Sequence, residues 1–245
     1  MQPTPPTELD KALNLDFAEK DTIWLQKQDT LRRLVGLLGI GLPVLLYLGL
    51  WIDTGHYLPI TSISHYYLTR VGSLFVIIVS LLAIFLLVYK GKDRLDFYLS
   101  SLAGLSALCV LLFPTNNIVE ATNAAHHTHP YAVTILKVSD TRMIFHFIAA
   151  AIFLLSLAAM SFFLFTKSDK PKELRTREKK IRNRIYRTTA VIMVLAIAVI
   201  FSSIWDLIDP VFYNKYALTF WMEAIAVWSF GISWLIKGKM MMKDE

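Results

Sequence analysis

The residues best suited to chemistry are six histidines and six carboxylates that lie near the ends of apolar runs. The histidines are His56, His65, His126, His127, His129 and His146. The carboxylates are Asp53, Glu120, Asp140, Asp206, Asp209 and Glu223. Imidazole and carboxylate groups are ligands for zinc and similar divalent ions. Cys109 is the single cysteine, which excludes a multi-cysteine metal site or a disulfide within one chain.

Six apolar runs must position these groups. The chain of 245 residues is 55% hydrophobic and 18% charged, too apolar for an ordinary soluble domain. The runs cover residues 34–52, 71–89, 95–113, 142–166, 188–208 and 217–236. Each has about the length that a helix needs to cross ~30 Å of hydrocarbon. We therefore predict an all-α polytopic membrane protein with six transmembrane helices.

The charge pattern predicts the orientation of these helices. All but four of the 25 lysines and arginines lie in segments that a six-span topology places on one side, and the exceptions are Arg70, Lys137, Arg142 and Lys215. The positive-inside bias puts the basic side, and both termini, in the cytoplasm. Residues 1–33 then form a cytoplasmic segment with an interfacial helix, residues 34–237 the membrane domain, and residues 238–245 a cytoplasmic tail.

The positions of the basic residues also indicate which binding partners to expect, anionic lipid or nucleic acid. Ten of them lie in residues 167–187, a linker that we expect to adsorb to anionic lipid. They occur in short segments at helix ends, without interleaved aromatic residues, which argues against a nucleic-acid surface despite the net charge of +6.

Of the ionisable side chains inside predicted membrane helices, two most need an explanation. His146 is about one turn from the outer end of the fourth helix, and Glu223 is about two turns into the sixth. Such groups are costly in lipid and usually face a cavity or a partner. As structural alternatives, His146 would donate to a backbone carbonyl or a tyrosine, and Glu223 would form a buried ion pair with Arg70 or Arg142.

His65 lies at the mouth of the second predicted helix, directly after Ser64. Adjacent residues on a helix point about 100° apart, so this pair is weak evidence for nucleophilic catalysis. The structural alternative is a helix cap made by Ser62 or Ser64, with His65 at the interface.

Several enzyme signatures are missing from the chain. We find no phosphate-binding glycine loop, no two-histidine helix motif with an intervening glutamate, and no second pair of membrane histidines for a haem. Catalytic residues cannot be assigned, and whether the protein is an enzyme stays open.

Four short motifs carry a resemblance to a known family. They are the SISHYY mouth at residues 62–67, Phe113-Pro114, MIFHFIAAAIF at residues 143–153, and WMEAIAVWSFGISWL at residues 221–235. Across most of residues 34–237 the chain resembles bacterial six-helix membrane proteins of a domain-of-unknown-function family, distantly similar to the DRAM and FGF-receptor-activating protein group. The resemblance implies a multi-pass protein of the bacterial inner membrane, and that family has no settled activity.

These observations lead to one functional hypothesis and two alternatives. We expect an outward-facing polar cavity, formed by His65, Arg70, His146, Asp206 and Glu223, that binds a lipid headgroup or a small ligand without demonstrated catalysis. The first alternative is a metal-dependent hydrolase acting on a lipid, in which His65, His146 and Glu223 hold zinc or a similar divalent ion and its bound water is the nucleophile. The second is a pH-sensing or proton-coupled membrane protein. The sequence also leaves a homo-oligomer open.

Overall fold

The computed structural model describes residues 27–118, 131–168, 171 and 174–241. Within these residues the chain is helical and contains no β-strand, only an isolated bridge between Thr69 and Ala132. The predicted interfacial helix in residues 1–26, Glu120 and the histidine tract at His126, His127 and His129 lie outside the described residues.

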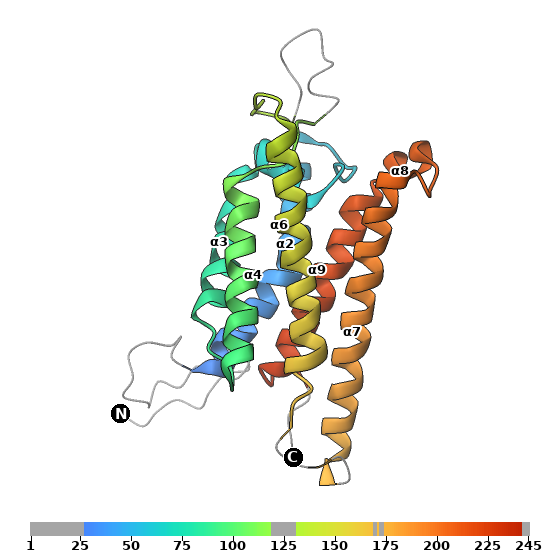
Figure 1. The fold of residues 1–245 in the computed structure, drawn as a ribbon. Helices are drawn as coiled ribbons and strands as arrows, with labels where there is room; N and C mark the ends of the chain where they lie inside the picture. The colour runs from blue at the N-terminus through green and yellow to red at the C-terminus, as the bar shows by residue number, and fades with distance from the viewer. Residues whose placement is uncertain (1–26, 119–130, 169–170, 172–173, 242–245) are drawn as a thin grey trace, which may run out of the picture.

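Six long helices form the bundle shown in Figure 1. They are α2 (Gln28–Thr54), α3 (Gly72–Val88), α4 (Arg94–Leu112), α6 (Asp140–Ala159, extended by the π-helix η3, Met160–Leu164), α7 (Arg177–Ser202) and α9 (Leu218–Lys237). Three short helices lie between them: η2 (Ile63–Leu68), η5 (Ser203–Trp205) and α8 (Pro210–Lys215). The long helices pack as a ring in the order α2, α3, α4, α6, α7, α9, and α9 closes the ring against α2.

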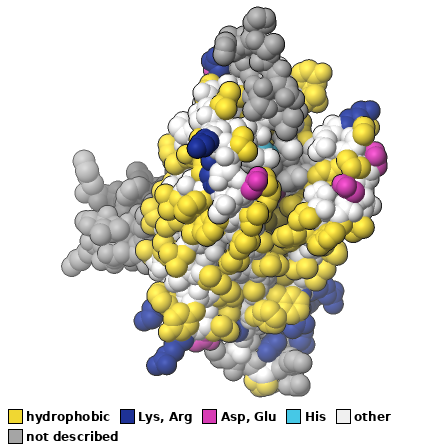
Figure 2. All heavy atoms as spheres, turned by 45° about the horizontal axis from the view of Figure 1, so that its top comes forward, with side chains coloured by type: hydrophobic (Ala, Val, Ile, Leu, Met, Phe, Trp, Pro, Cys, Tyr) yellow, Lys and Arg dark blue, Asp and Glu magenta, His cyan; other side chains and the backbone are white. Residues whose placement is uncertain are grey.

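Five of these helices, all except α3, are long and apolar enough to cross a membrane. Helix α3 is equally apolar but has 17 residues, which corresponds to about 25 Å of helix. Large apolar side chains such as Ile84, Leu105 and Leu195 are exposed on the outer surface of the bundle. Figure 2 shows hydrophobic side chains over the middle of the molecule and several Lys and Arg side chains at its lower end. A continuous apolar surface of this kind requires lipid or a partner to cover it.

Small residues allow the helix backbones to approach closely. A Cβ atom on Gly231 of α9 would lie 2.8 Å from the backbone oxygen of Gly36 on α2. A Cβ atom on Gly104 of α4 would lie 2.8 Å from the backbone oxygen of Ala83 on α3. Such contacts are typical of helix packing in membranes. The hydrophobic effect does not drive helices together in lipid, so association depends on close van der Waals packing, which small residues allow.

Two helices, α2 and α7, begin more than one turn before their predicted apolar runs. Helix α2 starts at Gln28, and its first turns include Arg32 and Arg33, which are both buried in the bundle. Arg32 pairs with Asp29 at 2.8 Å, and Arg33 Nε donates to the carbonyl oxygen of Gly238 at 2.9 Å. The prediction was based on hydropathy, which counts charged residues against a membrane span. It therefore assigned the start of α2, before residue 34, to the cytoplasmic segment.

Helix α7 begins at Arg177, so part of the basic linker is helical and continues directly into the apolar run. Its start is capped by Thr176, whose side chain accepts a hydrogen bond from the backbone N–H of Lys179. The helix stops at Ser202, before the predicted residue 208, because the chain turns through a left-handed residue at Asp206 (φ 48°).

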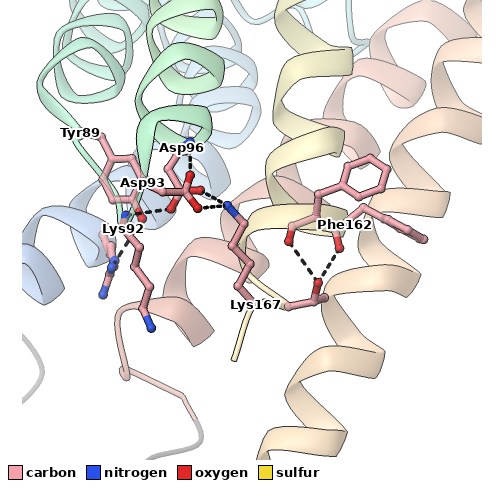
Figure 3. Close-up of polar contacts among 9 residues, drawn as sticks. Tyr89, Lys92, Asp93, Asp96, Phe162 and Lys167 are labelled. Carbon is pink, nitrogen blue, oxygen red and sulfur yellow. Dashed lines mark hydrogen bonds and ion pairs between the residues drawn. The ribbon is translucent and has the colours of Figure 1, made fainter. Parts of the chain in front are cut away.

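At the lower end of the bundle in Figure 1, an ion-pair cluster ties the α3–α4 turn to the segment after η3. Lys167 Nζ lies 2.6 Å from Asp93 Oδ2 and 2.7 Å from Asp96 Oδ1 (Figure 3). Asp96 Oδ2 accepts a further hydrogen bond from the backbone N–H of Lys92 at 2.8 Å. We call this end, where α2 begins and α9 ends, the basic end.

Candidate ligand-binding cavity

A cavity of about 400 Å³ lies at the end of the bundle opposite the basic end. Its walls come from η2, the segment after α4, the first half of α6, the last turns of α7, and the α8–α9 segment. Pockets that bind small ligands commonly measure about 300–1,000 Å³. Residues far apart in the sequence are therefore brought together around a space of suitable size.

Four of the five predicted site residues line this cavity: His65, His146, Asp206 and Glu223. Arg70 does not line it. Its guanidinium Nη1 lies 3.7 Å from Asp53 Oδ2, and both side chains are about half exposed. The prediction for Arg70 was therefore wrong, because a carboxylate at the end of α2 holds its side chain away from the cavity.

The η2 helix holds His65 at the cavity wall through a cap. Ser62 is the N-cap, and its Oγ accepts a hydrogen bond from the backbone N–H of His65 at 3.2 Å. The same Oγ lies 2.7 Å from His65 Nδ1. The predicted serine cap is thus confirmed, and it belongs to Ser62. The hydroxyl has a hydrogen to donate and a second lone pair to accept with, so it can bond Nδ1 in either tautomer of His65.

His65 is 9% exposed, and this burial sets its protonation state. Burial, and to a smaller extent the charge interaction with His146, lowers the pKa of His65 to about 4, while a side-chain hydrogen bond with Asn116 acts in the opposite direction. His65 is therefore neutral near pH 7.

His146 lies in the second turn of α6 and is 2% exposed. Its Nδ1 lies 2.8 Å from the carbonyl oxygen of Phe113. A carbonyl oxygen can only accept, so Nδ1 carries the hydrogen and Nε2 of the neutral ring keeps a free lone pair. The predicted bond from His146 to a backbone carbonyl is confirmed, and it orients the ring within the cavity wall.

Glu223 does not form the predicted ion pair. One carboxylate oxygen, Oε2, accepts a hydrogen bond from the backbone N–H of Ile63 at 2.6 Å. Arg142 instead donates to the carbonyl oxygens of Pro114 (3.1 Å) and Lys137 (2.8 Å). Glu223 thus satisfies an N–H at the start of η2, which needs a partner from outside that helix.

Sequence reasoning missed most of the other residues that line the cavity, among them Asn116, Tyr213 and Asn214. Tyr213 is buried in α8, and its hydroxyl lies 3.0 Å from Thr219 Oγ1. Uncharged polar residues in connecting segments are common, and their sequence carries no signal that distinguishes a cavity wall from a surface loop.

The described residues contain no group of three or more His, Cys, Asp or Glu side chains placed to hold a metal ion. His65, His146 and Glu223 share the cavity without forming such a group.

Comparison with known proteins returned no match among family models, curated proteins or solved structures. The geometry of the cavity is therefore the basis for a functional proposal.

Proposed function

We propose that this protein is a six-span membrane protein that binds a lipid headgroup or a small ligand in the cavity, without demonstrated catalysis. One observation carries the proposal: two imidazoles and two acidic side chains from four separate segments line a single cavity of about 400 Å³. Ionisable groups are costly at this depth unless they serve a cavity or a partner.

The proposed topology includes α3 as the sixth span. Its 17 apolar residues cover about 25 Å, so local thinning of the bilayer would accommodate it at modest cost. The basic end faces the cytoplasm, as the charge bias requires, and the cavity opens toward the opposite side of a bacterial inner membrane. The described part of the linker at residues 167–187 then lies against anionic lipid, with no role in nucleic-acid binding.

Cysteine labelling tests this topology. In a Cys109→Ser background, Lys215→Cys places a thiol beside the cavity end and Lys180→Cys places one at the basic end; both lysines are exposed. We expect a membrane-impermeant maleimide to label the Lys215→Cys variant in intact bacterial cells, and the Lys180→Cys variant only after permeabilisation. Labelling of both in intact cells would contradict the orientation. The two variants remove the same positive charge, so each is the control for the other.

A cavity-filling variant tests ligand binding. Ala151 on α6 lines the cavity, and Ala151→Trp should fill much of its apolar part. We expect native mass spectrometry of the detergent-purified protein to show a bound-molecule adduct in the wild type that is lost in this variant. The control is Leu155→Trp, one turn further along α6 at a residue that is 46% exposed outside the cavity. Identical adducts in all three proteins, or none in the wild type, would count against binding in this cavity.

The two alternatives are less favoured. A zinc hydrolase needs a ligand group that the described residues do not form. Stoichiometric zinc, lost when His65→Ala and His146→Ala are combined, would nevertheless favour it. For a pH sensor working between about pH 5 and 8, His65 is a poor candidate, because its pKa of about 4 lies below that range.

A further inference from the structure

The cavity is amphipathic along the axis of the bundle. Its polar side chains come from η2, the segment after α4, the second turn of α6 and the segments on either side of α8, and the walls that α6 and α7 form further into the bundle are apolar. The apolar wall consists of Phe147, Ala150, Ala151 and Leu154 on α6 together with Ile197 and Ile200 on α7. From Phe147 to Leu154, α6 rises about 10 Å into the apolar part of the bundle. A ligand that fills this space has a polar head and an apolar extension.

The apolar part of the cavity lies between α6 and α7, which pack together less extensively than α4 packs with α6 or α7 with α9. Phe147 on α6 is 48% exposed and Ile204 beyond α7 is 63% exposed, so the cavity wall reaches the outer surface of the bundle. A volume of about 400 Å³ is near the lower limit for a ligand pocket and accommodates a headgroup with part of an alkyl chain. The remainder of a longer chain would pass between α6 and α7 into lipid.

The charges around the cavity favour a cationic headgroup. Among the described residues that line the cavity there is no lysine or arginine, whereas two acidic side chains, Asp206 and Glu223, are present. His146 adds an acceptor at Nε2, because its Nδ1 hydrogen is bonded to the Phe113 carbonyl. A phosphate in this space would find no lysine or arginine among the described lining residues and would lie beside two acidic side chains, which is unfavourable at low dielectric. A protonated amine supplies the hydrogen-bond donors and the charge that these acceptors lack.

We propose that the ligand is a single-chain amphiphile with a protonated amine headgroup and no phosphate, with its amine at the end of the cavity that Asp206, Glu223 and His146 line and its chain between α6 and α7. This inference rests on the proposed function and specifies the chemical class of the ligand.

Three probes with the same chain test this class: octylamine, octanol and octyl phosphate. Binding would be measured at pH 7 by titration calorimetry on protein in phosphatidylcholine nanodiscs, with empty nanodiscs subtracted. We expect octylamine to bind at least about tenfold more tightly than octyl phosphate, with octanol between them, because like charges at a site disfavour binding strongly. Butylamine should bind more weakly than octylamine, since it lacks the methylene groups that the apolar wall buries.

Conservative variants identify the side chains that produce the preference for the amine over the phosphate. Glu223→Gln retains an oxygen that can accept from the Ile63 N–H, and Asp206→Asn alters an exposed residue, so both should fold and both should reduce the preference for the amine. The matched control is Asp53→Asn, a carboxylate that pairs with Arg70 outside the cavity and should leave the preference unchanged.

The outcomes separate this inference from the proposed function. Equal affinities for octylamine and octyl phosphate, or a preference that survives both cavity variants, would overturn the amine assignment. Failure of all octyl probes to bind, with an adduct still lost on Ala151→Trp, would also overturn it but would leave a binding cavity in place. If none of the probes binds and the wild type shows no adduct, the proposed function itself is contradicted.

Discussion

Asp96→Asn should lower the free energy of unfolding by about 3 kcal/mol, the cost expected when one partner of a buried ion pair is removed. The Asp96 side chain is 5% exposed and accepts hydrogen bonds from Lys167 Nζ (2.7 Å) and from the Lys92 backbone N–H (2.8 Å) (Figure 3). An asparagine is isosteric but loses the charge, so the ammonium of Lys167 keeps only the exposed carboxylate of Asp93. The midpoint of unfolding by heat or by SDS in mixed micelles would measure the loss.

Asp93→Asn provides the matched control, since it removes the other carboxylate bound to the same ammonium. Hydrogen bonding to Lys167 lowers the pKa of Asp93, but its side chain is 51% exposed, and exposed ion pairs contribute little after screening. Partial burial alone would lower the pKa of Lys167, yet its hydrogen bonds to Asp93 and Asp96 raise it overall. We therefore expect only a small change in Asp93→Asn, and one that shrinks further in high salt. Equal losses in the two variants would show that burial does not distinguish the two carboxylates.

The helical architecture was predictable because each apolar run is long enough to cross a membrane and the runs are separated by polar segments. The ends of the helices were less predictable. Arg32 and Arg33 look like the end of a span in the sequence, but bonds to Asp29 and to the Gly238 carbonyl allow them to be buried in α2. Hydropathy counts each charge alone, so it cannot anticipate a partner supplied by the other end of the chain.

The sequence predicts a cavity residue where an ionisable side chain lies inside or beside an apolar run. His146 and Glu223 stood out because ionisable groups are rare inside apolar runs, and both line the cavity. Arg70 was misplaced because the sequence does not reveal that Asp53 lies 3.7 Å from its guanidinium. Asn116 was missed because an uncharged amide in a connecting segment resembles many others, and its place in the cavity wall depends on the tertiary fold.

His65 should make the protein less stable as the pH falls from about 6.5 to about 4. Burial lowers its pKa from 6.5 to about 4, so over this range an unfolded chain binds a proton at His65 that the folded chain does not bind. The unfolded state is favoured wherever it binds more protons, so this contribution is fully present above pH 6.5 and is lost as the pH falls. A shift of this size corresponds to about 3 kcal/mol.

His65→Asn isolates this contribution from the other titratable groups of the cavity, His146, Asp206 and Glu223, which are present in both proteins. The variant loses the bond between the imidazole and Ser62, so it should be somewhat less stable than the wild type at pH 8. Thermal unfolding in detergent between pH 8 and 4 should then show the two proteins converging, because the wild type loses more stability than the variant on acidification. Curves that stay parallel over the whole range would mean that His65 is not held neutral by burial, and the cavity would then be wetter than its geometry indicates.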